Sequence, residues 1–245
     1  MLVWIGLVIL LVMLQPNFSM GSMLFGLSIL LLFIGGARVS HILLLFAVAI
    51  PVLALYMWSA PYRRARVMGF FQGHHVAGGS HNYQLQQGIF GFAIGGIFGV
   101  GPGESKQRDF FLPESYGDFV FSIVGEEYGL LGTMLVMGLF LVMMLRGFKI
   151  AKHAEDMFGR HLAIAITSAV TLYALVNASV TLGILPTTGL PMPFVSYGGS
   201  SMVFSAFAIG LLLNISSQTD LHPRAVAVPE LVNIGESNAS MGKVY

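Results

Sequence analysis

The chain has 245 residues, of which 56% are hydrophobic and 9% charged, and its net charge is +1. A soluble domain carries about 25% charged residues, so this composition excludes an ordinary soluble protein and indicates an integral membrane protein. A net charge this close to zero argues against a nucleic-acid partner, and the chain has no cysteine with which to form disulfides or thiolate metal sites.

Six apolar runs have about the length that a membrane-crossing helix needs, which is roughly 20 residues. In chain order they are 1–15, 20–36, 41–59, 119–145, 161–185 and 198–215. The first run lacks a basic start and a small-residue cleavage site, so it is a poor signal peptide. We interpret it as a membrane helix that has lost its beginning, and we expect the chain to be the C-terminal portion of a longer protein.

The sequence therefore predicts an all-α, polytopic membrane helix bundle with six spans over residues 1–218, followed by a polar, disordered tail at 219–245. A long loop, 60–118, separates the third and fourth spans. Within it, residues 88–100 are apolar and rich in glycine. This stretch of 13 residues suits a re-entrant or interfacial segment better than a seventh crossing.

Basic residues predict the orientation of the bundle. The loop between the fourth and fifth spans carries Arg146, Lys149, Lys152 and Arg160, which the positive-inside rule places in the cytoplasm. The loop 60–118 is then extracytoplasmic, and the tail is cytoplasmic. Three arginines directly after the third span resist this assignment, because charge alone would place them inside and make 88–100 a crossing. We give more weight to the short length of 88–100.

Six of the eleven acidic residues fall between Glu104 and Glu127. Asp118 opens the fourth span, where two interpretations stay open. It can cap the helix, with Ser115 as a rival cap. It can also act as a general base, since a half-buried carboxylate at an apolar mouth can have its pKa raised by desolvation. Glu126 and Glu127 lie about two turns further on, and we expect them to be structural, paired with an arginine of the loop.

The loop 60–118 also holds basic side chains that suit an anionic ligand. Arginine binds phosphate through two hydrogen bonds and lysine as a point charge, but their spacing is equally typical of ordinary solvated loop charges. The candidates for substrate binding are Arg63, Arg64, Arg66, Lys106 and Arg108. Three histidines within 73–81 do not match common zinc spacings, so we predict no metal site there.

The stretch LPTTGLPMPFVSYGGSS, residues 185–201, joins the fifth and sixth spans. Its three prolines and three glycines exclude a helix, and non-helical backbone at this depth must line a cavity or pack on protein. We therefore predict that it forms a wall of a substrate cavity, with hydroxyl groups from Ser196, Tyr197, Ser200 and Ser201 at the membrane edge.

Four stretches in order resemble signatures of the SEDS family, the bacterial proteins of shape, elongation, division and sporulation. QPNF at 15–18 is similar to QPDxG, and 83–114 resembles a glycine-rich segment that ends in FLPE. DFVFSIVGEEYGLLG at 118–132 resembles DFIFAxxxEExGxxG, and 183–201 resembles GxLPxxGxPLPFxSYGGSS. The sequence of this last stretch favours the division type of the family over the elongation type. The resemblance implies a ten-helix fold, of which this chain would begin at the fifth helix.

The resemblance also implies an activity, which is polymerisation of lipid II by a peptidoglycan glycosyltransferase. The catalytic acid of the family falls on Asp118, Lys106 and Arg108 fall near its basic position, and Glu114 matches the LPE glutamate as a substrate-side residue. This chain departs from the family at Asn17, at Ser19 and in the motif ERHTDF, where Tyr116 and Gly117 replace His and Thr.

The same resemblance implies a lipid-linked pyrophosphate substrate on the extracytoplasmic side of the bacterial cytoplasmic membrane. A divalent cation, Mg²⁺ or Mn²⁺, is one way to neutralise that pyrophosphate. The expected partners are a class B penicillin-binding protein transpeptidase and other membrane proteins of the division or elongation machinery. Two other functions stay open: a lipid II flippase, which should carry charges deep in its spans, and a non-catalytic division scaffold.

Overall fold

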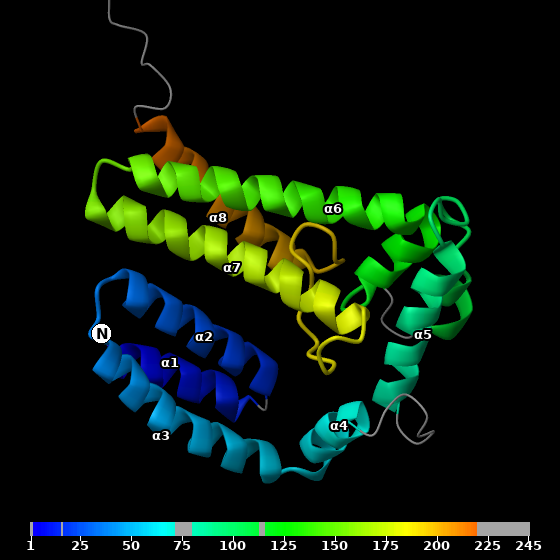
Figure 1. Ribbon diagram of the computed structural model, residues 1–245, viewed down its shortest axis with the longest axis horizontal. Helices are drawn as coiled ribbons and strands as arrows, with labels where there is room; N and C mark the ends of the chain where they lie inside the picture. Colours follow the sequence, from blue (N-terminus) through cyan, green and yellow to red (C-terminus); the bar gives the residue numbers. More distant parts are fainter. Residues whose placement is uncertain (1, 16, 72–79, 113–115, 220–245) are drawn as a thin grey trace, which may run out of the picture.

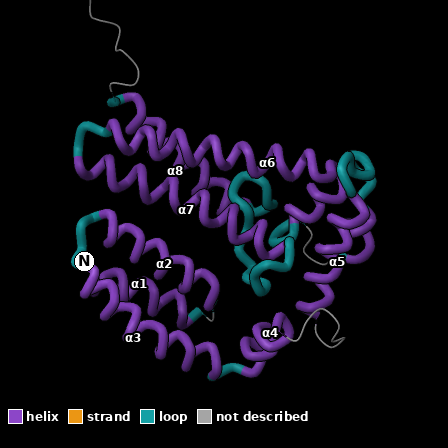
Figure 2. The backbone as a smooth tube through the Cα atoms, viewed as in Figure 1, coloured by secondary structure: helices purple, strands orange, loops and turns teal. Residues whose placement is uncertain are grey.

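The computed structural model describes residues 2–15, 17–71, 80–112 and 116–219. Within these ranges the protein consists of helices joined by turns and loops (Figure 2). The eight α-helices of this part are α1 Leu2–Leu14, α2 Phe18–Ile34, α3 Val39–Trp58, α4 Pro61–Phe71, α5 Ser80–Gly95, α6 Val120–His153, α7 Met157–Thr181 and α8 Gly199–Ser217. A π-helical turn, Gln107–Phe111, precedes α6. The all-α prediction is confirmed, whereas the expected tail lies outside the described residues.

Each of the six apolar runs is helical, although some ends differ from the prediction. α6 has 34 residues and continues to His153, past the expected end at 145. At about 1.5 Å per residue such a helix is longer than the hydrocarbon core, so the excess turns carry the basic residues beyond the membrane. α7 lies about four residues earlier than expected, because Asp156 caps it by accepting a hydrogen bond from the Gly159 N–H at 2.9 Å.

Helices α3, α6, α7 and α8 are long and apolar enough to cross a membrane, and α1 and α2 are shorter apolar helices. The protein is therefore a multi-pass membrane protein. The crossing of the bilayer by α1 and α2 stays a prediction. Much of the surface of α3, α6 and α8 is exposed and apolar, as lipid contact requires.

The antiparallel pair of α6 and α7 forms the centre of the bundle, with α8 beside it and the group α1–α3 next to α7 through α2 (Figure 1). In α7, 56% of an apolar 18-residue window is buried, against 6% in α3 and 11% in α8, so α7 is the most enclosed span. Small residues permit its close contact with α6: a Cβ on Gly147 would lie 2.1 Å from the Thr167 hydroxyl.

The two ends of the bundle differ in structure and charge. One end, which we call the loop end, brings together the α1–α2 turn, α4, α5, the start of α6 and the α7–α8 loop (Figure 1). Asn17 caps α2 there, since its Oδ1 accepts from the Met20 N–H at 3.1 Å. The opposite end holds the basic α6–α7 connection. A Cβ on Gly35, after α2, would lie 3.8 Å from His161 Nε2, which places the α2–α3 turn at that same end.

The segment 60–118 is more ordered than a simple loop, because it contains α4, α5 and the π-helical turn. α5 takes up the first part of the glycine-rich run 88–100. The chain then turns back between Gly96 and Gly103, where positive φ angles of 54°, 82°, 117° and 85° recur at four glycines. The run therefore does not continue as a single helix through 100.

Helix α6 is broken at Gly129, whose φ of 64° and ψ of −159° are not helical. The break leaves backbone groups without partners inside the helix, and the turn after α5 supplies them. The N–H groups of Leu130 and Leu131 donate to the carbonyls of Gly96 and Ile97 at 2.9 and 3.3 Å.

The carbonyls on the other side of the break are satisfied in the same way. Those of Glu126 and Glu127 accept from the N–H groups of Val100 and Gly101 at 3.0 and 3.1 Å. Two backbones lie in direct contact here, which only glycine permits. A Cβ on Gly95 would lie 2.0 Å from the carbonyl oxygen of Gly125.

We expect Gly95→Ala to lower the free energy of unfolding by about 1–3 kcal/mol, because the added methyl group forces α5 away from α6. The measurement is the thermal unfolding midpoint of the intact protein in detergent. Gly138→Ala is the matched control, since Gly138 is also helical but a Cβ there would meet no atom within 4 Å. Equal midpoints for the two variants would contradict the close contact.

Candidate active site

Asp118 lies in the turn that leads into α6, and its side chain is half-buried. The N-cap residue of α6 is Phe119, which makes no capping hydrogen bond through its side chain. The structure therefore does not place Asp118 at the cap position. Its Oδ2 lies 3.3 Å from the point that a Cβ on Gly189 would occupy, so the carboxylate packs against the backbone of the α7–α8 loop.

Two residues of the α7–α8 loop hold the backbone just before Asp118. The Tyr197 N–H donates to the carbonyl of Tyr116 at 2.7 Å. The Ser196 hydroxyl donates to the carbonyl of Gly117 at 2.6 Å and accepts from the Met192 N–H at 2.7 Å. Ser196 is buried, so its hydroxyl has a structural role, whereas the Tyr197 side chain is 88% exposed.

Asn177 of α7 holds Asp118 itself. Its Nδ2 donates to the carbonyl of Asp118 and to that of Leu190, both at 2.8 Å. Asn177 is 1% exposed, and within the described parts of the chain its Oδ1 has no hydrogen-bond partner. The sequence reasoning missed this residue. Its signal was an amide within the apolar run ALVNASV, since polar groups inside spans usually serve a partner or a site.

These contacts enclose a small pocket of about 60 Å³ next to Asp118, which we call the Asp118 pocket. Its walls are Gln84, Asp118, Phe119, Asn177, Val180, Thr187, Thr188, Gly189 and Leu190. The α7–α8 loop lines this pocket through Thr187, Thr188, Gly189 and Leu190, and its role as a wall of a substrate cavity stays a prediction. The pocket is large enough for one small polar group such as a hydroxyl, and too small for a sugar ring.

A second cavity of about 500 Å³, which we call the large cavity, adjoins this pocket. The two share Thr187, Thr188 and Leu190 as wall residues. The other walls are Gln15, Asn17, Phe18, Ser19, Ser22, Met23, Met57, Val67, Val176 and Pro186. Amide and hydroxyl side chains stand beside apolar ones, so the large cavity suits an amphipathic ligand.

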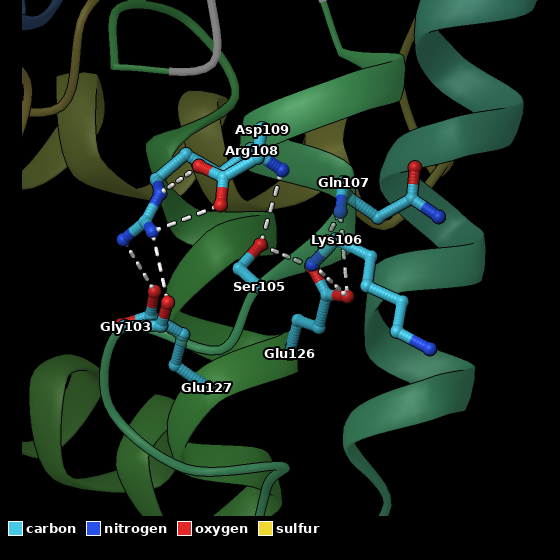
Figure 3. A network of polar contacts seen from close by, with 8 residues as sticks. All are labelled: Gly103, Ser105, Lys106, Gln107, Arg108, Asp109, Glu126 and Glu127. Carbon is cyan, nitrogen blue, oxygen red and sulfur yellow. Dashed lines mark hydrogen bonds and ion pairs between the residues drawn. The ribbon is translucent and has the colours of Figure 1, made fainter.

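A separate polar network lies where the chain enters the π-helical turn (Figure 3). The carboxylate of Glu126, which is fully buried, accepts from the backbone N–H groups of Lys106 and Gln107 at 3.1 and 3.2 Å and from the Ser105 hydroxyl. Such donors offset the large free-energy cost of a buried charge. The prediction that Glu126 is structural is confirmed, with backbone amides in the place of an arginine.

Arg108 belongs to the same network and pairs with Glu127, which confirms the predicted pair between a glutamate and a loop arginine. Its Nη1 donates to Glu127 Oε1 at 3.0 Å, its Nη2 to the Gly103 carbonyl at 2.9 Å, and its Nε to Asp109 Oδ1 at 2.7 Å (Figure 3). The hydrogen bond with Asp109 raises the pKa of Arg108, and the same bond lowers the pKa of Asp109. The pair is therefore charged at neutral pH.

Two of the predicted substrate-binding residues, Lys106 and Arg108, lie away from both cavities. Lys106 contributes only its backbone N–H to the network, and its ammonium group points away from both glutamates (Figure 3). Neither Lys106 nor Arg108 lines the Asp118 pocket or the large cavity. Substrate binding by these two residues stays a prediction, and the structure assigns Arg108 an additional structural role.

The remaining candidates are less fully described. Arg64 lies one turn before Val67 on α4, and its buried Nε has no hydrogen-bond partner within the described ranges. Ser200 is exposed in the first turn of α8. Glu114 and most of the histidine-rich stretch lie outside the described residues, as do the side chains of Arg63 and Arg66.

A family model described as "Cell cycle protein", FTSW_RODA_SPOVE, matches residues 1–221. The chain is 42% identical over 214 residues to a probable peptidoglycan glycosyltransferase FtsW of Geobacter metallireducens, covering 86% of this chain and 57% of the relative. It is 37% identical over 207 residues to stage V sporulation protein E of Bacillus subtilis, covering 84% and 56%. The chain thus spans little more than half the length of these curated relatives.

A solved structure is similar as well. One of its chains superposes with a TM-score of 0.70 and 28% sequence identity, covering 88% of this chain and 60% of the other. That structure is described as "Structural coordination of polymerization and crosslinking by a peptidoglycan synthase complex".

We expect Glu126→Gln to lower the free energy of unfolding by about 1–3 kcal/mol, because the amide group that replaces one carboxylate oxygen cannot accept the hydrogen bonds that this oxygen receives. Glu104→Gln, an exposed glutamate of the same segment, should leave stability unchanged. Thermal unfolding of the intact protein in detergent measures both. If Glu126→Gln unfolds at the same temperature as Glu104→Gln, the buried network does not stabilise the loop end.

Proposed function

Because the chain belongs to the SEDS family of cell cycle proteins, we propose that the intact protein is a peptidoglycan glycosyltransferase that polymerises lipid II into glycan strands. The observation that carries the proposal is Asp118, a carboxylate beside a small pocket that adjoins an amphipathic cavity at one end of a membrane bundle.

Asp118 acts as the general base in this proposal. The 4-hydroxyl of the acceptor sugar loses its proton to the Asp118 carboxylate as its oxygen attacks the anomeric carbon of the donor. The new glycosidic bond forms, the bond from the anomeric carbon to the pyrophosphate oxygen breaks, and the lipid pyrophosphate leaves. The volume of the Asp118 pocket, about 60 Å³, supports the entry of the hydroxyl group alone, with the sugar ring remaining outside.

The leaving pyrophosphate needs positive charge or hydrogen-bond donors. Arg64 is the best supported of the described candidates, because it lies three residues before Val67 on α4 and Val67 lines the large cavity. Side chains three apart share a helix face. Arg63, Arg66 and Lys106 are further candidates, as is Glu114 for orienting the substrate.

The large cavity takes the part of the substrate where lipid meets pyrophosphate. Its apolar walls, such as Phe18, Met23 and Met57, suit a polyprenyl chain. Its amide and hydroxyl groups, such as those of Gln15, Ser22 and Thr188, suit polar oxygens. A ligand with one apolar and one polar end fits both the apolar and the polar walls of the large cavity.

A resident metal ion is not part of this proposal. Within the described ranges, no three His, Asp or Glu side chains come together as a group that could hold a metal ion. Any Mg²⁺ or Mn²⁺ that accompanies the pyrophosphate is part of the substrate, and no step is assigned to it.

The loop end faces the extracytoplasmic side in this proposal, and the basic end faces the cytoplasm. Arg38, Arg146, Lys149, Lys152 and Arg160 lie at or near the basic end, as the positive-inside rule requires. The membrane is then the bacterial cytoplasmic membrane, and the substrate reaches Asp118 from its outer surface.

The proposed partner is a class B penicillin-binding protein transpeptidase, which crosslinks the strands that this protein polymerises. The similar solved structure supports this choice, because its description joins polymerisation and crosslinking in one complex.

Asp118→Asn should lower the rate of glycan polymerisation by about 10²–10⁴-fold, because the amide keeps the size of the carboxylate and removes its capacity to take a proton. The measurement is strand formation from purified lipid II by the intact protein together with its transpeptidase partner. Asp156→Asn makes the same chemical change at the opposite end of the bundle and should keep wild-type activity, since asparagine is an equally good helix cap. An active Asp118→Asn variant would exclude Asp118 as the base. A wild-type protein that makes no strands would favour a flippase or a scaffold.

A further inference from the structure

We propose that Asn177 is a positioning residue, which fixes the backbone of Asp118 so that its carboxylate stays in the Asp118 pocket. The proposal rests on the function proposed above for Asp118. It assigns to α7, which also lines the two cavities through Val176 and Val180, direct control over the geometry of the base.

The two hydrogens of one amide nitrogen make the contact. Nδ2 of Asn177 reaches the carbonyl of Asp118 and the carbonyl of Leu190, each at 2.8 Å. These carbonyls belong to two segments that are far apart in the sequence and that together wall the Asp118 pocket. A hydroxyl group has one hydrogen and an ionised carboxylate has none, so serine or aspartate cannot join both segments.

The donor lies in a buried part of the protein. Asn177 is 1% exposed, and its helix neighbours Ala174 and Ala178 are 0% and 5% exposed. Both alanines belong to the core that joins α6, α7 and Met192. The amide is therefore shielded from bulk water, and it has little freedom to turn away from its two acceptors.

A second contact acts on the preceding peptide. Ser196 donates to the carbonyl of Gly117 and accepts from Met192, whose side chain is fully buried in the same core. The carbonyls on two consecutive residues are therefore held by donors that are both anchored in the core. With the peptides at 117 and 118 fixed, the direction in which the Asp118 side chain leaves the backbone is fixed as well.

This arrangement predicts an effect on the rate of reaction and little effect on binding. Displacement of a reacting group by about 1 Å can slow a reaction by about 10²-fold. The substrate is held mainly by the walls of the large cavity, which Asn177 does not line. Loss of the amide should therefore lower kcat and leave KM nearly unchanged.

The test compares Asn177→Ala with Thr181→Ala in the intact protein and its partner, using lipid II as the substrate. Thr181 is the matched control, because it lies one turn further along α7 and is also fully buried. Among the described residues it donates to carbonyls of its own helix, those of Asn177 and Ala178. We expect Asn177→Ala to lower kcat by about 10–100-fold with KM within about 3-fold of wild type, and Thr181→Ala to keep wild-type kcat.

Amide hydrogen exchange provides a readout that a general loss of stability would not reproduce. Asn177→Ala should speed exchange in peptides that cover 116–123 and leave exchange in the second half of α6, 130–153, unchanged. A wild-type kcat for Asn177→Ala overturns the proposal. So does an equal loss of kcat in both variants with faster exchange throughout the protein.

Ser196→Ala keeps the proposal testable if Asn177→Ala does not fold, because it removes one oxygen atom and the adjacent contact. It should show the same fall in kcat at unchanged KM, and wild-type kcat would overturn the proposal. Asp118→Asn separates this inference from the function on which it rests. An inactive Asp118→Asn beside a fully active Asn177→Ala refutes the positioning role alone, whereas an active Asp118→Asn refutes the proposed base.

Discussion

A break in a membrane helix exposes backbone groups that no water can satisfy, and the loop end of this protein is organised around one such break in α6. Gly129 interrupts the helix, and the backbone from Gly96 to Gly101 supplies the missing partners. Because that turn must lie directly on α6, α5 is drawn against the start of α6. The π-helical turn then follows within reach of Glu126 and Glu127. The segment of chain that leads to Asp118 therefore starts from a turn whose position on α6 is fixed.

The acidic residues near this break have three different environments, although they are close together in the sequence. Glu126 is buried and receives backbone N–H groups, which makes it part of the packing. Glu127 is neutralised by Arg108. Asp118 lines the small pocket that adjoins the large cavity, and its own carbonyl and that of Gly117 are held by buried donors. The same kind of side chain therefore serves structure twice and, in our proposal, chemistry once.

The helices and the structural role of the paired glutamates could be predicted from the sequence, because hydrophobic run length and the cost of a buried charge are local properties. The contents of 60–118 could not be predicted in detail. Its α5 and the π-helical turn pack against α6, and no local sequence pattern indicates those contacts. The same reason applies to Arg108, because its place in the sequence does not tell which carboxylates it pairs with in the fold.

The role of Asn177 could not be predicted from the sequence for a further reason. One amide within an apolar span shows that a partner exists and gives no indication of which partner, and here the partners lie 59 and 13 residues away. The placement of Asp118 shows the reverse case. The sequence left a helix cap and a general base open, and the resemblance favoured the base. The structure then placed the cap position at Phe119.

The segment before Asp118 is held by its carbonyl oxygens, at Tyr116, Gly117 and Asp118. Every residue type carries such an oxygen, so the contacts place no demand on the side chains at positions 116 and 117. Evolution can therefore change these two residues and keep the geometry of the turn. The geometry of the turn is therefore compatible with Tyr116 and Gly117 in the motif that resembles ERHTDF, ahead of Asp118.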